Sequence, residues 1–270
     1  MQRWIRPHRT IALCVCLLVF VSAEKAGEAP HVTAPPAELK LDPFYKKYVD
    51  AAGIPVVSSD KVPDRALLGA REIVIHMLSQ RDDVRGAIVK NQVRVAIMSK
   101  DEVTTDIPEH ADLNKVFPGT DWNTRCRGVG ATVERPASSG AEENLLVYAK
   151  DPYKGENIFI HEFAHTIFNT GIKFVDKDFA DELRKAYDSA MQRGLWKQTY
   201  AATNADEYWA EGVQDWFDAN LHADPPNGIH NAVHTREQLK KYDPELARLI
   251  RKIFPDDGWR YRAGAKSVKP

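Results

Sequence analysis

The sequence predicts an α+β fold, with a mixed upper lobe that contains a small sheet and a mainly helical lower lobe. In the first half, the amphipathic residues 64–80 predict a helix and the β-branched residues 93–99 predict a strand. With 43% hydrophobic residues the chain can bury a sizeable core, so we expect residues 43–270 to form one two-lobed domain. Three stretches of the second half place apolar side chains at helical spacing: residues 157–170, 177–194 and 203–220.

The N-terminus has the pattern of a secretory signal peptide in residues 1–23. Arg3, Arg6 and Arg9 precede a short apolar stretch that ends in small residues at Ser22 and Ala23. The stretch is too short to cross a bilayer, so we expect cleavage after Ala23 and a secreted protein without a stable membrane anchor. Cleavage would remove three of 37 basic residues and none of 38 acidic residues, which leaves a net charge of −4. This mild charge indicates no nucleic-acid partner.

Residues 24–42 are rich in Ala, Pro and Glu without periodicity, and we interpret them as a flexible segment, with a short pro-segment as the alternative. We expect ordered structure from Pro43, beginning with a helix at residues 44–52. The helix at 64–80 follows, and then a turn at 81–83 before the strand at 93–99.

Turn-forming residues dominate residues 108–140, which we expect to be a loop with one short strand. Gly128 and Gly130 belong to no phosphate-binding motif, so we assign them to this loop. The next stretch, residues 144–150, has the composition of a strand. We expect this strand to border a cleft, where an extended peptide could pair with it.

Residues 157–170 contain His161, Glu162 and His165 in the order HExxH, inside an otherwise apolar helix that we expect to end at Gly171. A helix turns by about 100° per residue, so the two imidazoles lie one above the other and can share a metal ion. Glu162 lies one position further round, where it can reach a water on that metal. The pattern is typical of a zinc hydrolase.

The alternative interpretation is that His161, His165 and Glu162 are core residues that make ordinary hydrogen bonds. We favour the metal because buried histidines need polar partners and one ion serves both rings at once. A second pair with the same spacing, His230 and His234, has no glutamate after the first histidine and follows a Pro-rich loop. We expect that pair to lie on the surface or in a cleft wall.

The helix expected at residues 203–220 has one core stripe and one acidic side. Glu207 and Glu211 lie together on the side opposite the stripe, where carboxylates are usually solvated. Thr203 and Asp206 form a capping pair, which leaves Glu207 free. A zinc ion held by two histidines lacks a third protein ligand, and an acidic residue from a separate downstream helix, here Glu207, can supply it. We expect Glu211, one turn further along the same face, to accept a hydrogen bond from a ligand histidine and fix its tautomer. The apolar stripe consists of Trp209, Val213, Trp216 and Phe217.

The sequence resembles the gluzincin metallopeptidases, and within them the group like the catalytic domain of anthrax lethal factor. The resemblance rests on HEFAH at 161–165 and on YAATNADEYWAE at 200–211, and it covers roughly residues 157–219. It implies a zincin-like metallopeptidase fold with Glu207 as zinc ligand, Glu211 outside it, and Tyr200 beside the reacting oxyanion. Ala164 stands where the toxin has glycine, and the chain has no room for delivery domains, so a toxin's role is not implied.

These observations lead to the hypothesis of a secreted zinc-dependent endopeptidase in which Glu162 takes a proton from a zinc-bound water. The expected partner is a peptide or protein, and nothing in the pattern indicates an oligomeric state. One alternative is a binding module that retains zinc without turnover, and another is a zinc hydrolase of non-peptide amides. Cys126 is the one cysteine left after signal cleavage, and we expect a buried or unpaired thiol, or a link to another molecule, rather than a thiolate that occupies the zinc.

Overall fold

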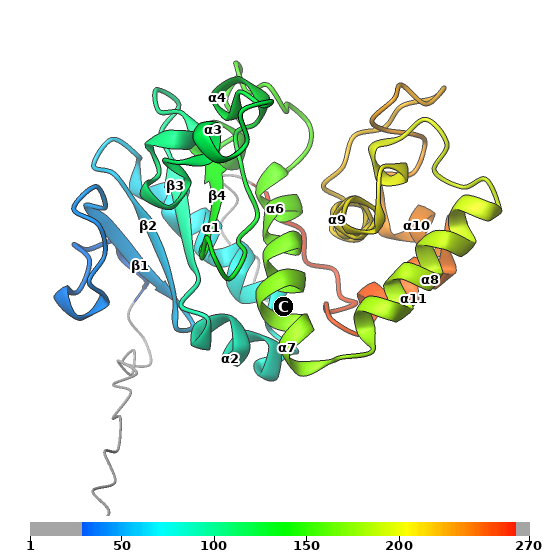
Figure 1. Cartoon of the computed structure of the whole chain (residues 1–270), viewed down its shortest axis with the longest axis horizontal. Coiled ribbons are helices and arrows are strands. Elements are labelled where there is room, and N and C mark those ends of the chain that lie inside the picture. The colour runs from blue at the N-terminus through cyan, green and yellow to red at the C-terminus, as the bar shows by residue number, and fades with distance from the viewer. Residues whose placement is uncertain (1–28, 263–270) are drawn as a thin grey trace, which may run out of the picture.

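A computed structural model of the chain describes residues 29–262, so the predicted signal peptide and most of the basic C-terminal tail lie outside the described residues. Figure 1 shows a sheet in one half of the molecule and a group of helices in the other. The predicted α+β class, with a small sheet in one lobe and a mainly helical second lobe, is confirmed. Within residues 29–262 no helix has the length and apolar character needed to cross a membrane.

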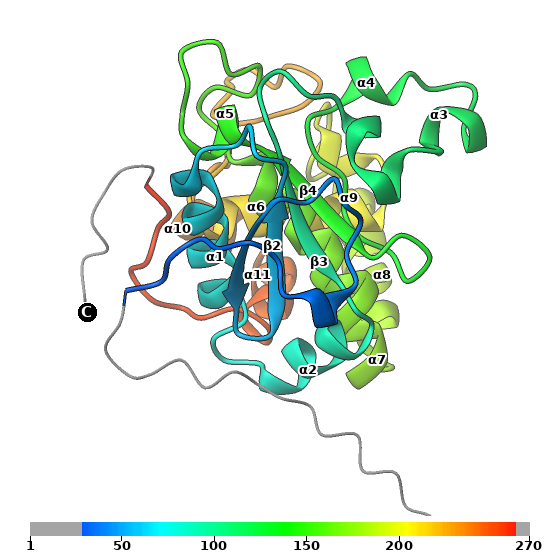
Figure 2. The ribbon, with the colours of Figure 1, turned by 90° about the vertical axis from the view of Figure 1, so that its left-hand side faces the viewer.

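The sheet has four strands in sequence order: β1 (Lys47–Ala51), β2 (Ile54–Ser58), β3 (Arg94–Met98) and β4 (Ala137–Ala141). The first two strands form an antiparallel hairpin, while β3 and β4 run parallel to β2. Ala52 and Gly53 form the two-residue turn of the hairpin with φ values of 55° and 92°, the left-handed conformation that such turns require. Figure 2 looks onto the sheet, with α6 and the helical lobe behind it.

The sheet is covered on both faces. One face packs against α1 (Asp64–Met77) and belongs to the large core that also contains the helical lobe. The other face carries a smaller apolar cluster that includes Tyr45, Val57 and Met98. Because both faces are buried, the central strands lack the alternation that marks a half-exposed strand.

Two of the predicted secondary structures are wrong. Residues 44–52 contain β1 rather than a helix, because the turn at Gly53 folds this segment back along β2. The strand predicted at 144–150 is absent, and β4 lies earlier, at Ala137–Ala141. That strand is wholly buried and made of Ala, Ser and Gly, so it has no apolar pattern to detect. Its small residues are needed because a Cβ at Gly140 would lie 3.0 Å from the Phe159 ring.

The upper lobe also contains structure that the sequence did not indicate. The strand predicted at 93–99 is confirmed as β3, but a second helix, α2 (Asp82–Lys90), lies between α1 and β3 where only a turn at 81–83 was expected. Contacts with the sheet begin before Pro43, since Thr33 pairs with Tyr48 through two backbone hydrogen bonds of 2.8 Å. The short helices of the upper lobe are η1 (Ala37–Leu39), η2 (Thr104–Asp106), η3 (Pro108–His110), α3 (Leu113–Val116), α4 (Trp122–Arg125) and α5 (Glu142–Leu145).

The histidine-bearing helix is α6 (Ile158–Ile167), as the sequence predicted. Its N-cap is Asn157, whose side chain accepts a hydrogen bond from the Ile160 amide at 3.0 Å. The predicted end at Gly171 is wrong: the chain continues as a π-helix, η4 (Phe168–Ile172), and then as α7 (Lys173–Val175). Gly171 instead allows α2 to pack closely, because a Cβ there would lie 2.7 Å from Val84 Cγ1.

The lower lobe is helical, with α8 (Phe179–Gln192), η5 (Tyr200–Ala202), α9 (Ala205–Trp216), α10 (Arg236–Tyr242) and α11 (Pro244–Arg251). The predicted core stripe of α9 is confirmed, since Trp209, Val213, Trp216 and Phe217 are all buried. The predicted cap is wrong: Asn204, not Thr203, accepts hydrogen bonds from the first amides of α9. The indole Nε1 of Trp209 donates to the carbonyl of Ala164 at 3.0 Å and so joins α9 to α6.

Candidate metal centre

The structure brings together three side chains from the two helices α6 and α9. The Nε2 atoms of His161 and His165 lie 3.1 Å apart, and each lies 3.1 Å from Glu207 Oε2. Within residues 29–262 these three form the one group of His, Cys, Asp and Glu side chains that could hold a metal ion. Glu207 therefore lies where the sequence placed it, 42 residues beyond His165 in the chain but in contact with it in space.

The spacing of these atoms fits a tetrahedral metal ion. Ligand atoms at about 2.0–2.1 Å from a tetrahedral centre are about 3.3 Å apart, close to the observed 3.1 Å. The protonation of His161 points the same way. Its Nδ1 lies 2.8 Å from Gln214 Oε1, an acceptor, so Nδ1 carries a proton. A cation that takes the place of a proton on Nε2 would therefore find the Nε2 lone pair directed at Glu207.

The electrostatics of the site also favour a cation. Burial disfavours the charged imidazole of His161, yet the carboxylates of Glu207, Glu211 and Glu162 outweigh it and hold the pKa well above its usual range. Burial likewise opposes ionisation of Glu207, but its hydrogen bonds to His161 and His165 lower the pKa of that carboxyl. The three carboxylates thus attract positive charge to His161 Nε2, and a divalent ion could replace the proton there.

Gln214 holds His161 in place, and the sequence analysis did not identify it. Glu211, which was expected to accept a hydrogen bond from a ligand histidine, has Oε1 at 3.4 Å from His161 Nδ1, longer than the 2.8 Å to Gln214. The other oxygen of Glu211 accepts from Asn220 Nδ2 at 3.0 Å. Gln214 lies seven residues after Glu207, two turns along the same face of α9, so helical spacing could have indicated it.

Glu162 lies beside residues 127–131, a segment that pairs with β4 through one bridge at Val129 and that we call the edge segment. Val129 in this segment pairs with Ser139 of β4, and Ala131 N donates to Thr166 Oγ1 of α6 at 2.9 Å. A Cβ at Gly128 would lie 2.9 Å from Glu162 Cγ. Within residues 29–262 the Glu162 carboxylate has no hydrogen-bonding or ion-pair partner. The glycine of the edge segment therefore lies directly over a carboxylate that is free to bind water.

Gly130 lies even closer to α6 than Gly128 does. A Cβ at this position would lie 2.6 Å from His165 Cβ and 3.1 Å from the Glu162 carbonyl oxygen. No side chain fits there without movement of the backbone. Gly128 and Gly130, which belong to no phosphate-binding motif, are thus needed for the contact between the edge segment and α6.

Tyr200, at the start of η5, points its phenol at the three candidate metal ligands, His161, His165 and Glu207, which we call the metal group. Its hydroxyl lies 3.2 Å from Glu207 Oε1, and Arg125 Nη2 from α4 lies 3.5 Å from the same hydroxyl. Burial, followed by the charge of Glu207, raises the pKa of Tyr200 to about 12. The phenol is therefore protonated at neutral pH and can donate a hydrogen bond to an oxygen in the site.

Two other expected features lie outside the metal group. Cys126 is half-buried, and burial together with the charge of Glu162 raises the pKa of its thiol, which disfavours the thiolate that a metal would bind. His230 and His234 do not face each other: His230 Nε2 lies 3.8 Å from Glu156 Oε1, whereas the ring of His234 packs against His222. Neither histidine belongs to a metal group in the described part of the chain.

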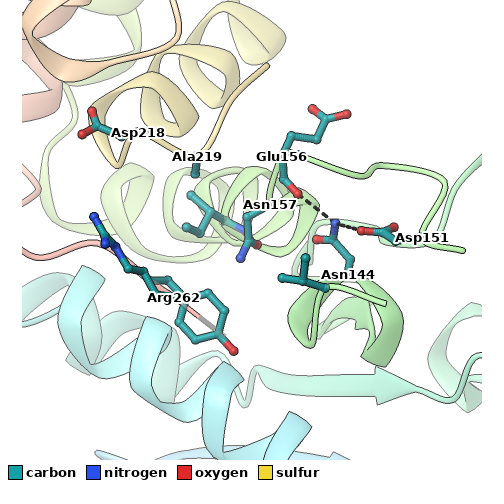
Figure 3. Close-up of a pocket in the computed structure, with 11 residues that line it drawn as sticks. Asn144, Asp151, Glu156, Asn157, Asp218, Ala219 and Arg262 are labelled. Carbon is teal, nitrogen blue, oxygen red and sulfur yellow. Dashed lines mark hydrogen bonds between the residues drawn. The ribbon is translucent and has the colours of Figure 1, made fainter. Parts of the chain in front are cut away.

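A cavity of about 190 Å³ lies near the N-terminus of α6 and contains none of the three ligand candidates. Figure 3 shows Asn144 at its rim, where the side-chain amide donates to Asp151 Oδ2 at 2.8 Å and to the Glu156 carbonyl at 2.9 Å. The oxygen of the same amide accepts from Ile158 N at 2.8 Å. Asn144 thus fixes the start of α6, which in turn positions the histidines.

Comparison with known proteins adds little to this geometry. No protein-family model and no curated protein matches the chain. A solved structure that matches is the Pro-Pro endopeptidase PPEP-2 from Paenibacillus alvei, with a TM-score of 0.47 and 18% sequence identity, over 74% of this chain and 97% of that chain. At this TM-score and identity the similarity implies nothing about activity.

Proposed function

We propose that this protein is a zinc-dependent endopeptidase of the zincin-like type, and that its likeness to the lethal-factor-like gluzincins reflects a shared reaction. The observation that carries the proposal is the triangle of His161 Nε2, His165 Nε2 and Glu207 Oε2, with all three separations at 3.1 Å. Two imidazoles and one carboxylate are the donor set of many catalytic zinc sites, in which a fourth position stays open. When bound, zinc would lower the pKa of a water to about 7 and polarise a carbonyl oxygen.

Each neighbouring side chain has a role that follows from its position. Glu162 has a carboxylate without a protein partner, so it can take a proton from water and pass it to the leaving amine. Tyr200 has a protonated hydroxyl 3.2 Å from Glu207 and can donate to the developing oxyanion. Gln214 holds the Nδ1 proton of His161 and so keeps the Nε2 lone pair directed at the metal position.

The edge segment supports a peptide as the substrate. The amide and carbonyl of Val129 face β4, where they bond to Ser139 at 3.0 and 2.8 Å. In a paired backbone the amides and carbonyls of neighbouring residues point the opposite way, so we infer that Gly128 and Gly130 direct theirs away from β4. A peptide could therefore add to this edge next to Glu162, which replaces the edge predicted at residues 144–150.

Metal analysis combined with digestion of a peptide library tests the proposal. We expect about one zinc ion per chain and cleavage by the wild-type protein, while Glu162→Gln keeps the metal and loses most activity. Equal cleavage by both proteins would contradict the role of Glu162, and no cleavage by the zinc-loaded wild type would favour the binding module. Activity on non-peptide amides alone would indicate a zinc hydrolase of such amides instead of a peptidase.

We also propose that the protein is exported after cleavage of its signal peptide. This proposal predicts a mature protein that begins at Glu24.

A further inference from the structure

Arg125 is a cation beside the metal centre that the proposed reaction does not use. It ends α4 of the upper lobe and lies two residues before the edge segment. Its Nη2 atom lies 3.5 Å from the hydroxyl of Tyr200, a residue of the lower lobe. Because that hydroxyl is 3.2 Å from Glu207 Oε1, the guanidinium lies within about 7 Å of the metal group. The side chain thus reaches across the site from one lobe to the other.

A second arginine nearby shows what a structural role looks like in this region. Arg127 is largely buried and forms a two-pronged ion pair with Glu143, at 2.6 and 3.1 Å, and it also bonds the Ser99 carbonyl at 2.9 Å. Arg125, in contrast, is exposed, and within residues 29–262 it forms no ion pair with a carboxylate. Its guanidinium therefore has donors left for another molecule.

The carboxylate nearest to Arg125 in the site has other partners. Glu207, the carboxylate that bonds the Tyr200 hydroxyl, already contacts His161 and His165 and would be held by the metal. The guanidinium of Arg125 is therefore not paired with a carboxylate of the site. A guanidinium binds a carboxylate with two parallel hydrogen bonds, which makes a carboxylate its best-matched partner.

We propose that Arg125 selects substrates that carry a carboxylate within about two residues of the bond to be cleaved. The distance follows from the reach of about 7 Å to the metal group and a rise of about 3.3 Å per residue in an extended peptide. The carboxylate belongs to an Asp or Glu side chain or to the peptide C-terminus. This inference rests on the proposed peptidase function and specifies the substrate class of the same site.

Matched peptides test the inference. Each pair has Glu in one peptide and Gln in the other at a single position within two residues of the cleaved bond, and one further pair compares a free with an amidated C-terminus. For the wild type we expect kcat/KM to be about tenfold higher for the acidic member at one position, mainly through KM. Arg125→Gln should bring the ratio of acidic to amide peptide close to one, and Arg125→Lys should keep part of the preference. Arg125→Glu should reverse it, so that the Gln peptide is cleaved better than the Glu peptide.

Lys185→Glu is the matched control, because it makes the same charge change at an exposed position of α8 in the lower lobe. It should leave the acid-to-amide ratio unchanged. The ratio within each variant cancels any general loss of activity, which separates recognition from a contribution to chemistry through Tyr200. An equal loss on acidic and amide peptides in Arg125→Gln, or an unchanged ratio in Arg125→Glu, would overturn the proposal.

A binding measurement distinguishes failure of this inference from failure of the proposed function. Fluorescent acidic and amide peptides are titrated into zinc-loaded Glu162→Gln and into the same variant with Arg125→Gln. If the wild type cleaves no peptide, the proposed function fails, yet tighter binding of the acidic peptide that depends on Arg125 would still support the inference. Cleavage without any preference for acidic residues would contradict the inference about Arg125 and would still support the proposed peptidase function.

Discussion

Replacement of Gln214 by Leu tests whether this side chain positions the metal-facing histidine. The Leu side chain removes the acceptor 2.8 Å from His161 Nδ1 and leaves Glu211 Oε1, at 3.4 Å, as the remaining acceptor. A buried donor that loses its acceptor costs about 1–3 kcal/mol. Loss of a hydrogen bond that supports a metal ligand weakens metal affinity by about 10–100-fold, which corresponds to about 1.4–2.8 kcal/mol. We expect a zinc Kd raised by this factor.

The assay is a zinc titration in competition with a chromophoric chelator, with the d–d absorption of Co²⁺ as a second reading of ligand geometry. Glu211→Asp is the comparison, because it keeps the negative charge and shortens the side chain; the longer contact of Glu211, 3.4 Å, predicts less than a few-fold change in Kd. Gln192→Leu, at an exposed position in the last turn of α8, controls for the substitution itself. Thermal unfolding of the metal-free variants checks that each is folded. If Glu211→Asp weakened zinc binding more than Gln214→Leu, the assignment of the orienting residue would be refuted.

Four further predictions follow from the same geometry. Glu207→Gln should weaken zinc binding by at least about 100-fold in the same titration, because one of three protein ligands loses its charge; wild-type affinity would contradict the triangle as a metal site. Gly130→Ala should lower the unfolding free energy by about 1–3 kcal/mol, measured in urea, because its Cβ would lie 2.6 Å from His165 Cβ; unchanged stability would show that the edge segment moves freely. Chelation of the metal should lower Tm, since an ion present at 1,000 times Kd stabilises by about 4 kcal/mol, and Tm should return when zinc is restored. Burial, followed by the charge of Glu211, raises the pKa of Glu156 to about 7, whereas the same carboxyl in the unfolded chain loses its proton near pH 4.5. The stability of the metal-free protein should therefore fall as pH rises from about 4.5 to about 7. Glu156→Gln should flatten that slope in urea titrations at several pH values.

Sequence alone determined the parts of this protein that depend on local periodicity. The stacking of His161 and His165 follows from four-residue spacing on a helix, whatever the helix packs against. The buried stripe of α9, including Trp209, likewise follows from the 3.6-residue repeat, and all four of its predicted members are buried. The sequence indicated Glu207 as a candidate metal ligand because it lies opposite that stripe, where a carboxylate can face another helix.

The periodicity of the sequence did not predict two of the strands, β1 and β4. Strand β4 consists of Ala, Ser and Gly because Phe159 and the edge segment pack against it, and no alternation marks it. The helix expected at 44–52 is strand β1 because pairing with β2 outweighs helical propensity. Gly171 looks like a helix end in sequence, but the approach of α2 makes it part of a continuous helix.

Only the tertiary structure decided which side chains meet across elements. Gln214 rather than Glu211 orients His161, because a difference of 0.6 Å in reach depends on how α9 crosses α6. Arg125 comes from a four-residue helix in a region the sequence showed as loop, and its place beside Tyr200 depends on the packing of one lobe against the other. Helical spacing is a property of a few consecutive residues, whereas contacts between distant segments depend on the whole fold.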